Sequence, residues 1–248
     1  EFAAGGRVDS PPTYHKGMIL FGSADGWVYG LRAGDGALAW RFRAAPAERL
    51  VGAFGQLESA WPVSGSVLVL GDTVYFAAGR SSHLDGGLRL YGLDAATGKL
   101  LHQAKREGPR YDSENFEVNF GLPQGTLPDI LVGEGTSLWM RTTGFDEKLQ
   151  PKAGRPELRV NGGYLDASYF KRTPWQLGAG GYARVIVRDK ECAYYLRMFD
   201  SLRGLDPTVY FVPGKAGYLL FAQQPDAKQM RWSKRIPIRG RALVVAIN

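Results

Sequence analysis

One short segment gathers residues whose types suit acid–base or metal chemistry. It reads Arg80-Ser-Ser-His-Leu-Asp-Gly86 and interrupts a run of predicted strands. Histidine titrates near neutral pH, so His83 beside Asp85 could exchange protons with a substrate or bind a metal. The alternative is structural: Arg80 pairs with Asp85, and His83 caps a turn. This loop is therefore either part of a catalytic site or a locked connection.

A second candidate lies on the connection Gln56-Leu-Glu-Ser-Ala-Trp61. We count Glu58 with Arg80, His83 and Asp85 as the catalytic candidates, and Trp61 as a ligand-binding candidate. The alternative for Glu58 is a salt bridge with Arg49 or Arg80.

A third cluster occupies the segment from Tyr164 to Trp175. Asp166 and Arg172 could bind a polar ligand, and Trp175 could stack on a sugar or another ring. Internal pairing of Asp166 with Arg172 on a structured loop is the alternative. No nucleophile elbow, phosphate-binding loop or H-E-x-x-H metal motif occurs in the chain.

The elements that must position these residues are predicted to be strands. Short segments rich in β-branched and aromatic residues are bounded by Gly, Asp or Pro, and no sustained helical pattern occurs. The clearest strands are Met18–Gly22, Trp27–Leu31, Val67–Leu70, Val74–Ala78, Leu88–Leu93, Arg184–Val187, Ala193–Met198, Thr208–Val212 and Tyr218–Ala222. The fold class is therefore all-β.

The strands recur as repeats. Val28-Tyr-Gly-Leu31 is matched by Leu90-Tyr-Gly-Leu93, and Asp35-Gly36 is matched by Thr97-Gly98 at the same spacing. The 33 glycines of this 248-residue chain suit hairpin turns, which need positive φ. A four-stranded sheet cannot cover its own apolar face, so several such sheets are expected to stack radially as a β-propeller.

We expect a single propeller over residues 1–248, with four blades of four antiparallel strands. The blades span about 10–46, 62–105, 127–160 and 180–234, and one extra C-terminal strand spans 242–247. Open edges are prone to association. A homodimer is therefore expected to complete one ring of about eight blades, with strand 242–247 joining the first blade of the neighbour.

Composition narrows the function. The net charge of +7 is spread thinly, so no nucleic-acid partner is expected. No segment approaches the ~18 apolar residues of a transmembrane helix. The first residues also lack the basic start and apolar stretch of a signal peptide. Cys192 is the one cysteine, which excludes an intramolecular disulfide and a thiolate zinc cluster. A divalent metal is possible but not indicated.

The segment from Gly17 to Trp40 reads G-x-x-x-x-G-S-x-D-G-x-V-Y-G-L-x-x-x-D-G-x-x-x-W. It resembles the repeat of the pyrroloquinoline-quinone-like β-propellers, which include quinoprotein alcohol dehydrogenases and non-enzymatic scaffold lipoproteins of outer-membrane assembly. The match is strongest over residues 10–150. It implies a fragment of a larger secreted bacterial protein, periplasmic or extracellular. In the dehydrogenases a vicinal disulfide and a Glu/Asn-bound calcium hold the quinone. Cys192 has no cysteine neighbour, so no quinone cofactor and no quinone-dependent dehydrogenase activity are expected.

Two functions remain open at this point. The first is a non-enzymatic binding or scaffold propeller, with a possible small-molecule ligand. The alternative is a hydrolase of small, possibly anionic esters or glycosides, with its site at the propeller channel.

Overall fold

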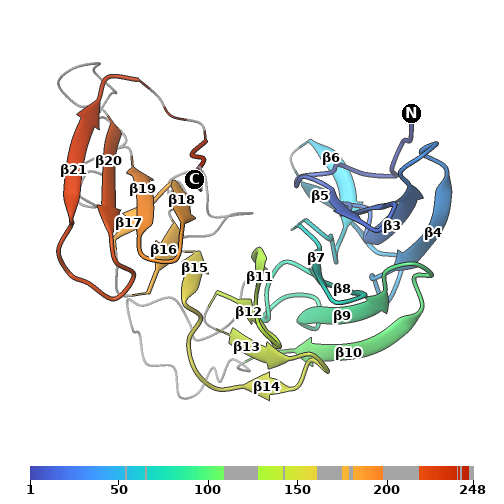
Figure 1. The fold of residues 1–248 in the computed structure, drawn as a ribbon. Coiled ribbons are helices and arrows are strands. Elements are labelled where there is room, and N and C mark those ends of the chain that lie inside the picture. Colours follow the sequence, from blue (N-terminus) through green and yellow to red (C-terminus); the bar gives the residue numbers. More distant parts are fainter. Residues whose placement is uncertain are drawn as a thin grey trace. The chain divides into compact units, whose positions relative to one another are not determined.

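A computed structural model describes residues 1–53, 55–64, 66–108, 128–141, 143–160, 175–178, 181–197, 218–238, 240 and 242–245. These residues form strands and turns, without a helix (Figure 1), which confirms the all-β prediction. Nor do they contain a helix long and apolar enough to cross a membrane. The chain divides into two compact units, Glu1–Arg155 and Pro156–Asn248.

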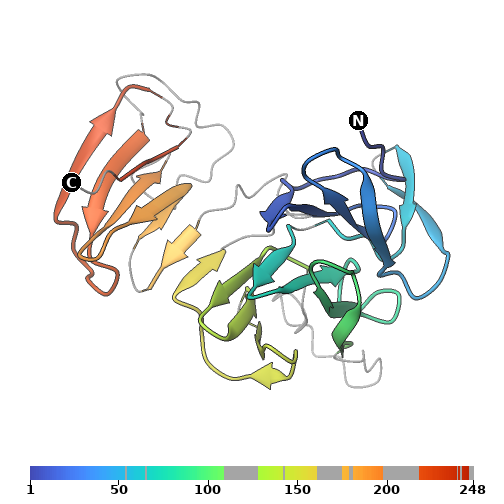
Figure 2. The same cartoon turned by 45° about the vertical axis from the view of Figure 1, so that its right-hand side comes forward.

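The first unit contains three four-stranded antiparallel sheets, each made of strands that follow one another in the chain (Figure 2). The first sheet consists of β1 (Thr13–His15), β2 (Met18–Gly22), β3 (Trp27–Arg32) and β4 (Leu38–Arg43). The second consists of β7 (Leu68–Leu70), β8 (Thr73–Ala78), β9 (Leu88–Asp94) and β10 (Leu100–Arg106). The third consists of β11 (Leu131–Glu134), β12 (Ser137–Met140), β13 (Thr143–Asp146) and β14 (Pro151–Lys152).

The register shows that the first two sheets are copies of one unit. Phe21 on β2 faces Tyr29 on β3, and Phe76 on β8 faces Tyr91 on β9 in the same way. The outer strands share an irregularity as well. One extra residue, Ala39 in β4 and Leu101 in β10, forms a β-bulge against the neighbouring strand.

The second and third sheets each pack one face on the sheet before it, and we call the corresponding face of any sheet its upstream face. Because side chains alternate along a strand, the upstream face of the second sheet contains Val74, Phe76, Tyr91 and Leu93. These residues share a buried core with Leu20, Val28 and Trp40 of the first sheet. The third sheet repeats the arrangement, since Leu138, Met140 and Phe145 share a core with Tyr75, Leu88 and Leu90.

The second unit contains two sheets. A three-stranded sheet is made of β15 (Leu158–Val160), β16 (Trp175–Leu177) and β17 (Tyr182–Ala183). A four-stranded sheet is made of β18 (Val185–Arg188), β19 (Ala193–Arg197), β20 (Tyr218–Gln223) and β21 (Trp232–Ile236). Their shared core contains Leu177, Ala183, Ala193, Tyr195, Leu219 and Phe221. The three-stranded sheet was not expected from the repeat pattern.

The expected C-terminal strand is not formed in the described residues. Residues 242–245 have no strand pairing, Val244 is 90% exposed, and residues 246–248 lie outside the described part of the chain. A strand needs a hydrogen-bonding neighbour, and none of the described strands pairs with this segment. The predicted strand Thr208–Val212 also lies outside the described residues.

Candidate functional site

Glu58 lies on a hairpin that connects the first sheet to the second. The hairpin consists of β5 (Leu50–Ala53) and β6 (Gln56–Ser59), and Glu58 pairs with Val51 across it. Alternation along β6 turns Leu57 outward and Glu58 inward. Glu58 is therefore only 2% exposed, and a carboxylate this buried requires a compensating charge.

Two arginines provide that charge. Arg80 Nη2 lies 2.8 Å from Glu58 Oε2, and Arg7 Nη1 lies 2.6 Å from Glu58 Oε1. The expected salt bridge with Arg80 is confirmed. Arg7 was missed, because it lies far away in sequence and no spacing connects it to Glu58. With both oxygens engaged by arginines, Glu58 is a structural anchor of the connection between the sheets.

Asp85 does not pair with Arg80, the partner expected if the loop is a purely structural connection. Its Oδ1 lies 2.6 Å from Arg49 Nη1, and its backbone carbonyl accepts a hydrogen bond from Trp61 Nε1 at 2.9 Å. The expected Arg80–Asp85 pair is therefore wrong. The physical reason is burial: Arg80 compensates the buried Glu58, whereas the more accessible Asp85 is paired by the exposed Arg49.

His83 is exposed on the same loop. Its backbone N–H donates a hydrogen bond to Ser81 Oγ at 3.2 Å, whereas no hydrogen bond or ion pair of its imidazole is found in the described structure. Nor do three or more His, Cys, Asp or Glu side chains gather in a metal-binding arrangement among the described residues. His83 could still meet a ligand from solvent, without an orienting partner from this loop.

Two of the four ligand-binding candidates, Trp61 and Trp175, lie in the described residues. Trp61 is buried, and its indole N–H already donates to Asp85. Trp175 lies half-buried in β16, where it pairs with Val160 and Ala183. Asp166 and Arg172 lie outside the described residues.

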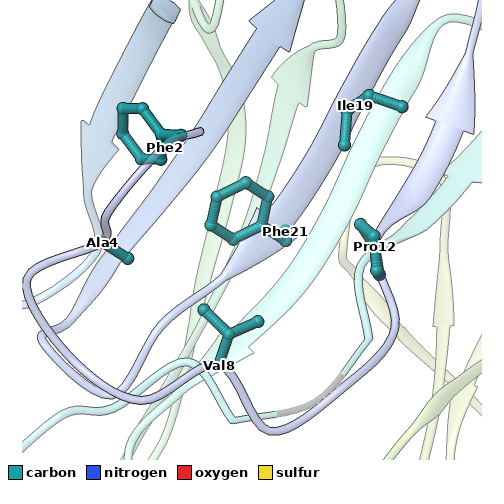
Figure 3. A pocket seen from close by; sticks show the side chains of 6 residues that line it. All are labelled: Phe2, Ala4, Val8, Pro12, Ile19 and Phe21. Atoms are coloured by element: carbon teal, nitrogen blue, oxygen red, sulfur yellow. The ribbon is translucent and has the colours of Figure 1, made fainter. Parts of the chain in front are cut away.

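An apolar pocket of about 190 Å³ opens on the upstream face of the first sheet. Phe21 and Ile19 contribute from the sheet, and Phe2, Ala4, Val8 and Pro12 contribute from the N-terminal segment that crosses it (Figure 3). The sequence analysis did not single out these residues. The alternation of Ile19 and Phe21 along β2 was the one signal that could have indicated them.

Tyr29 lies on this same face. Its hydroxyl donates a hydrogen bond to Asp25 Oδ2 at 2.5 Å. Burial of the ring, followed by the hydrogen bond to Asp25 and its negative charge, raises the pKa of Tyr29 to about 12. The tyrosine therefore remains neutral across the physiological range and contributes packing and a hydrogen bond.

The described residues do not fit a quinone and calcium site of the dehydrogenase kind. Cys192, the single cysteine of the chain, is buried directly before β19. A one-cysteine chain cannot form a vicinal disulfide, and the acidic side chains of the candidate loops are bound by arginines.

Sheets of consecutive antiparallel strands, each stacked on the one before, define the class of β-propeller repeat proteins. Within that class, the chain belongs to the family described as outer membrane protein assembly factor BamB, a pyrroloquinoline-quinone-type repeat family whose profile matches residues 1–127. No curated protein matches the sequence.

The chain is similar to several solved structures. BamB from Moraxella catarrhalis is 12% identical with a TM-score of 0.48, over 94% of this chain and 63% of that one. A europium-containing methanol dehydrogenase is 19% identical with a TM-score of 0.35, over 92% of this chain and 32% of that one. A quinohemoprotein alcohol dehydrogenase from Pseudomonas putida is 16% identical with a TM-score of 0.33, over 93% of this chain and 27% of that one. The chain thus spans less than two thirds of each of these proteins.

Proposed function

We propose that the chain is a non-enzymatic propeller module that binds protein partners, and that its parent protein serves outer-membrane assembly from the periplasmic side. Membership of the family described as an outer-membrane assembly factor carries this proposal. The site supports it, because the acids that would perform hydrolysis are held in ion pairs with arginines.

The hairpin β5–β6 offers a surface for such a partner. Leu50 and Leu57 lie on its outer face and are 57% and 71% exposed, and Leu84 on the adjoining loop is 53% exposed. Arg49, between this hairpin and the loop, is also largely exposed. Exposed apolar side chains with charged residues beside them are typical of protein-binding surfaces.

Site-specific photo-crosslinking tests this proposal. A photoreactive residue at position 57 of the full chain, expressed in a bacterial periplasm, should form adducts of defined mass with proteins of outer-membrane assembly. A photoreactive residue at Leu101, an exposed leucine of the outer strand β10, is the matched control and should not form them.

The hydrolase alternative makes the opposite prediction. Purified chain would then cleave esters or glycosides from a substrate panel, and His83→Ala would abolish the cleavage at an unchanged melting temperature. That result, together with an absence of protein adducts from position 57, would overturn the scaffold proposal. A metal-content measurement on the same sample tests whether a divalent metal is bound, and its absorbance spectrum tests the expectation that no quinone is bound.

The proposal includes self-association of the chain, but in an arrangement that differs from the ring expected from the sequence. The described residues contain four four-stranded sheets and one three-stranded sheet. Two chains would therefore bring more than the roughly eight blades of common propellers. We propose a head-to-tail contact between two copies in place of the closed eight-bladed ring that the four-blade count suggested.

A further inference from the structure

The contact between the first and second sheets contains an aromatic plug and a backbone socket. The plug is Trp40 on β4, which is 8% exposed. Its indole N–H donates a hydrogen bond to Ala95 O at 3.1 Å. Its ring lies on Gly98, where an added Cβ would sit 2.6 Å from the nearest ring atom. The socket is therefore the turn from Ala95 to Gly98.

The first sheet has the same socket, and no side chain of the described residues fills it. Ala33 and Gly36 are the repeat equivalents of Ala95 and Gly98, and both glycines have a φ of 71°. The turns are closed alike, because Gly36 N–H donates to Arg32 O as Gly98 N–H donates to Asp94 O, both at 2.8 Å.

The two sockets differ in what covers them. Ala95 is buried, whereas Ala33 is exposed. An added Cβ on Gly36 would meet no atom within 4 Å. No donor reaches the carbonyl oxygen of Ala33 among the described hydrogen bonds. The turn from Ala33 to Gly36 thus has the shape and the free acceptor of the occupied socket.

The last sheet has the same plug, which is left exposed among the described residues. Trp232 pairs with Ala222 as Trp40 pairs with Gly30. The neighbouring pair Tyr195–Phe221 is stacked like Phe21–Tyr29, and this fixes the equivalence. Trp232 is nevertheless 42% exposed. Its one aromatic neighbour in the described structure is Tyr194, at a ring separation of 6.3 Å.

The occupied contact also contains an edge-on phenylalanine, and on the upstream face of the first sheet the N-terminal segment provides its equivalent. Phe42 of the first sheet lies edge-on to Phe76 and Tyr91 at 6.2 and 5.2 Å, with interplanar angles of 63° and 66°. Phe2 lies edge-on to the equivalent rings of Phe21 and Tyr29 at 6.2 and 5.4 Å, with angles of 68° and 62°. Phe2 thus replaces the phenylalanine of a preceding sheet, whereas the Ala33–Gly36 socket is left exposed.

We propose that Trp232 of one copy docks on the Ala33–Gly36 turn of a second copy, with its indole N–H donating to Ala33 O. A second copy offers a matching socket for each plug, and the occupied contact around Trp40 supplies the geometry. Docking of Trp232 on the turn of its own chain is the other outcome of the test, and it would leave the wild type monomeric. This inference rests on the self-association in the proposed function and names its contact. Since the two surfaces differ, the contact is heterologous and can propagate.

Analytical ultracentrifugation of the purified full chain over a dilution series tests the contact. Wild-type protein should show dimers and larger species that dissociate on dilution. Trp232→Ser removes the plug, and Ala33→Glu places a charge in the socket, so each variant alone should remain monomeric. An equimolar mixture should regain dimers without larger species, because each variant retains the end that the other lacks.

Leu57→Ser is the matched control, since it also removes an exposed apolar side chain and should associate like the wild type. The two test substitutions lie in different compact units, and circular dichroism confirms the folding of each. The inference is overturned if the wild type is monomeric throughout, if both variants still associate, or if the mixture stays monomeric. Protein adducts from position 57 would still form in those cases, so failure of the docking contact leaves the scaffold function standing.

Discussion

The upstream faces of the first two sheets present the same pair of a phenylalanine and a tyrosine, and these pairs are covered in different ways. On the second sheet, Phe76 and Tyr91 are covered by Phe42 of the sheet before it. On the first sheet, Phe21 and Tyr29 are covered by Phe2 of the N-terminal segment, beside an apolar pocket. The repeat thus encodes a face that must be covered, and the covering can come from a whole sheet or from one aromatic side chain.

Removal of the plug inside the occupied contact should have the largest effect. Trp40→Ala empties a buried site and removes the hydrogen bond to Ala95, at a cost of about 3–5 kcal/mol in the free energy of unfolding. Trp232→Ala, at the uncovered equivalent, should cost about 1 kcal/mol or less in the dilute monomer. Urea unfolding of both variants measures the difference. Equal losses would show that the two tryptophans are not in different environments.

Loss of the carboxylate that anchors the N-terminal segment should come next. Glu58→Gln leaves Arg7 and Arg80 without their buried partner, and a broken buried pair costs about 3 kcal/mol. The exposed pair of Arg188 and Glu157 is the control, and Glu157→Gln should cost about 1 kcal/mol or less. Thermal unfolding in low and high salt compares them. A stable Glu58→Gln protein would show that Arg7 does not hold the N-terminal segment in place.

A pair of glycine substitutions separates the cost of a steric clash from the cost of backbone strain in the free energy of unfolding. Gly36→Ala and Gly98→Ala share a φ of 71°, so both incur about 1–2 kcal/mol of backbone strain. Only the Cβ on Gly98 would meet a ring, that of Trp40, which should add about 1–3 kcal/mol. Parallel denaturation curves give the difference. The comparison of the two sockets fails if both variants lose the same stability.

The smallest expected effect is on the pH dependence of stability, and it involves the equivalent residues Tyr29 and Tyr91. The folded state raises the pKa of Tyr29 to about 12, above its usual value near 10, so protonated Tyr29 favours folding. This contribution is complete below about pH 10 and is lost as the pH rises through about 12. Tyr29→Phe should flatten the dependence of the free energy of unfolding on pH in that window. Circular dichroism measures the unfolding, and tyrosinate absorbance measures the titration. An unchanged pH dependence of stability would show that Tyr29 does not cause it. Burial also raises the pKa of Tyr91, which makes Tyr91→Phe the matched comparison.

The sequence was most informative where the signal is local. Val28-Tyr-Gly-Leu31 and Leu90-Tyr-Gly-Leu93 predicted equivalent strands, because alternation and a turn glycine act within a few residues. The structure confirms the all-β class and places both segments in the same register of their sheets. The three-stranded sheet β15–β17 was missed, because strands of two or three residues are too short to show a period.

The site was harder to predict because its partners are distant in sequence. Nothing in the spacing selects Arg7 for Glu58, or Arg49 for Asp85 in place of Arg80. Burial makes that selection, and burial of Glu58 depends on how a whole hairpin sits on the sheet. Trp40 and Trp232 take equivalent places in their sheets. Trp40 is buried and Trp232 is exposed, because Trp232 has no following sheet in the described residues.

The bulges at Ala39 and Leu101 bear on how this chain can grow into larger assemblies. Both lie on the outermost strand of a sheet, the edge to which a foreign strand could otherwise add by backbone hydrogen bonding. A bulge twists that edge and breaks its regular row of donors and acceptors, and Arg41, Arg43 and Lys105 add charge along the same strands. Fibril-like growth by strand addition is thereby discouraged at these two edges, which is consistent with the side-chain docking that we propose.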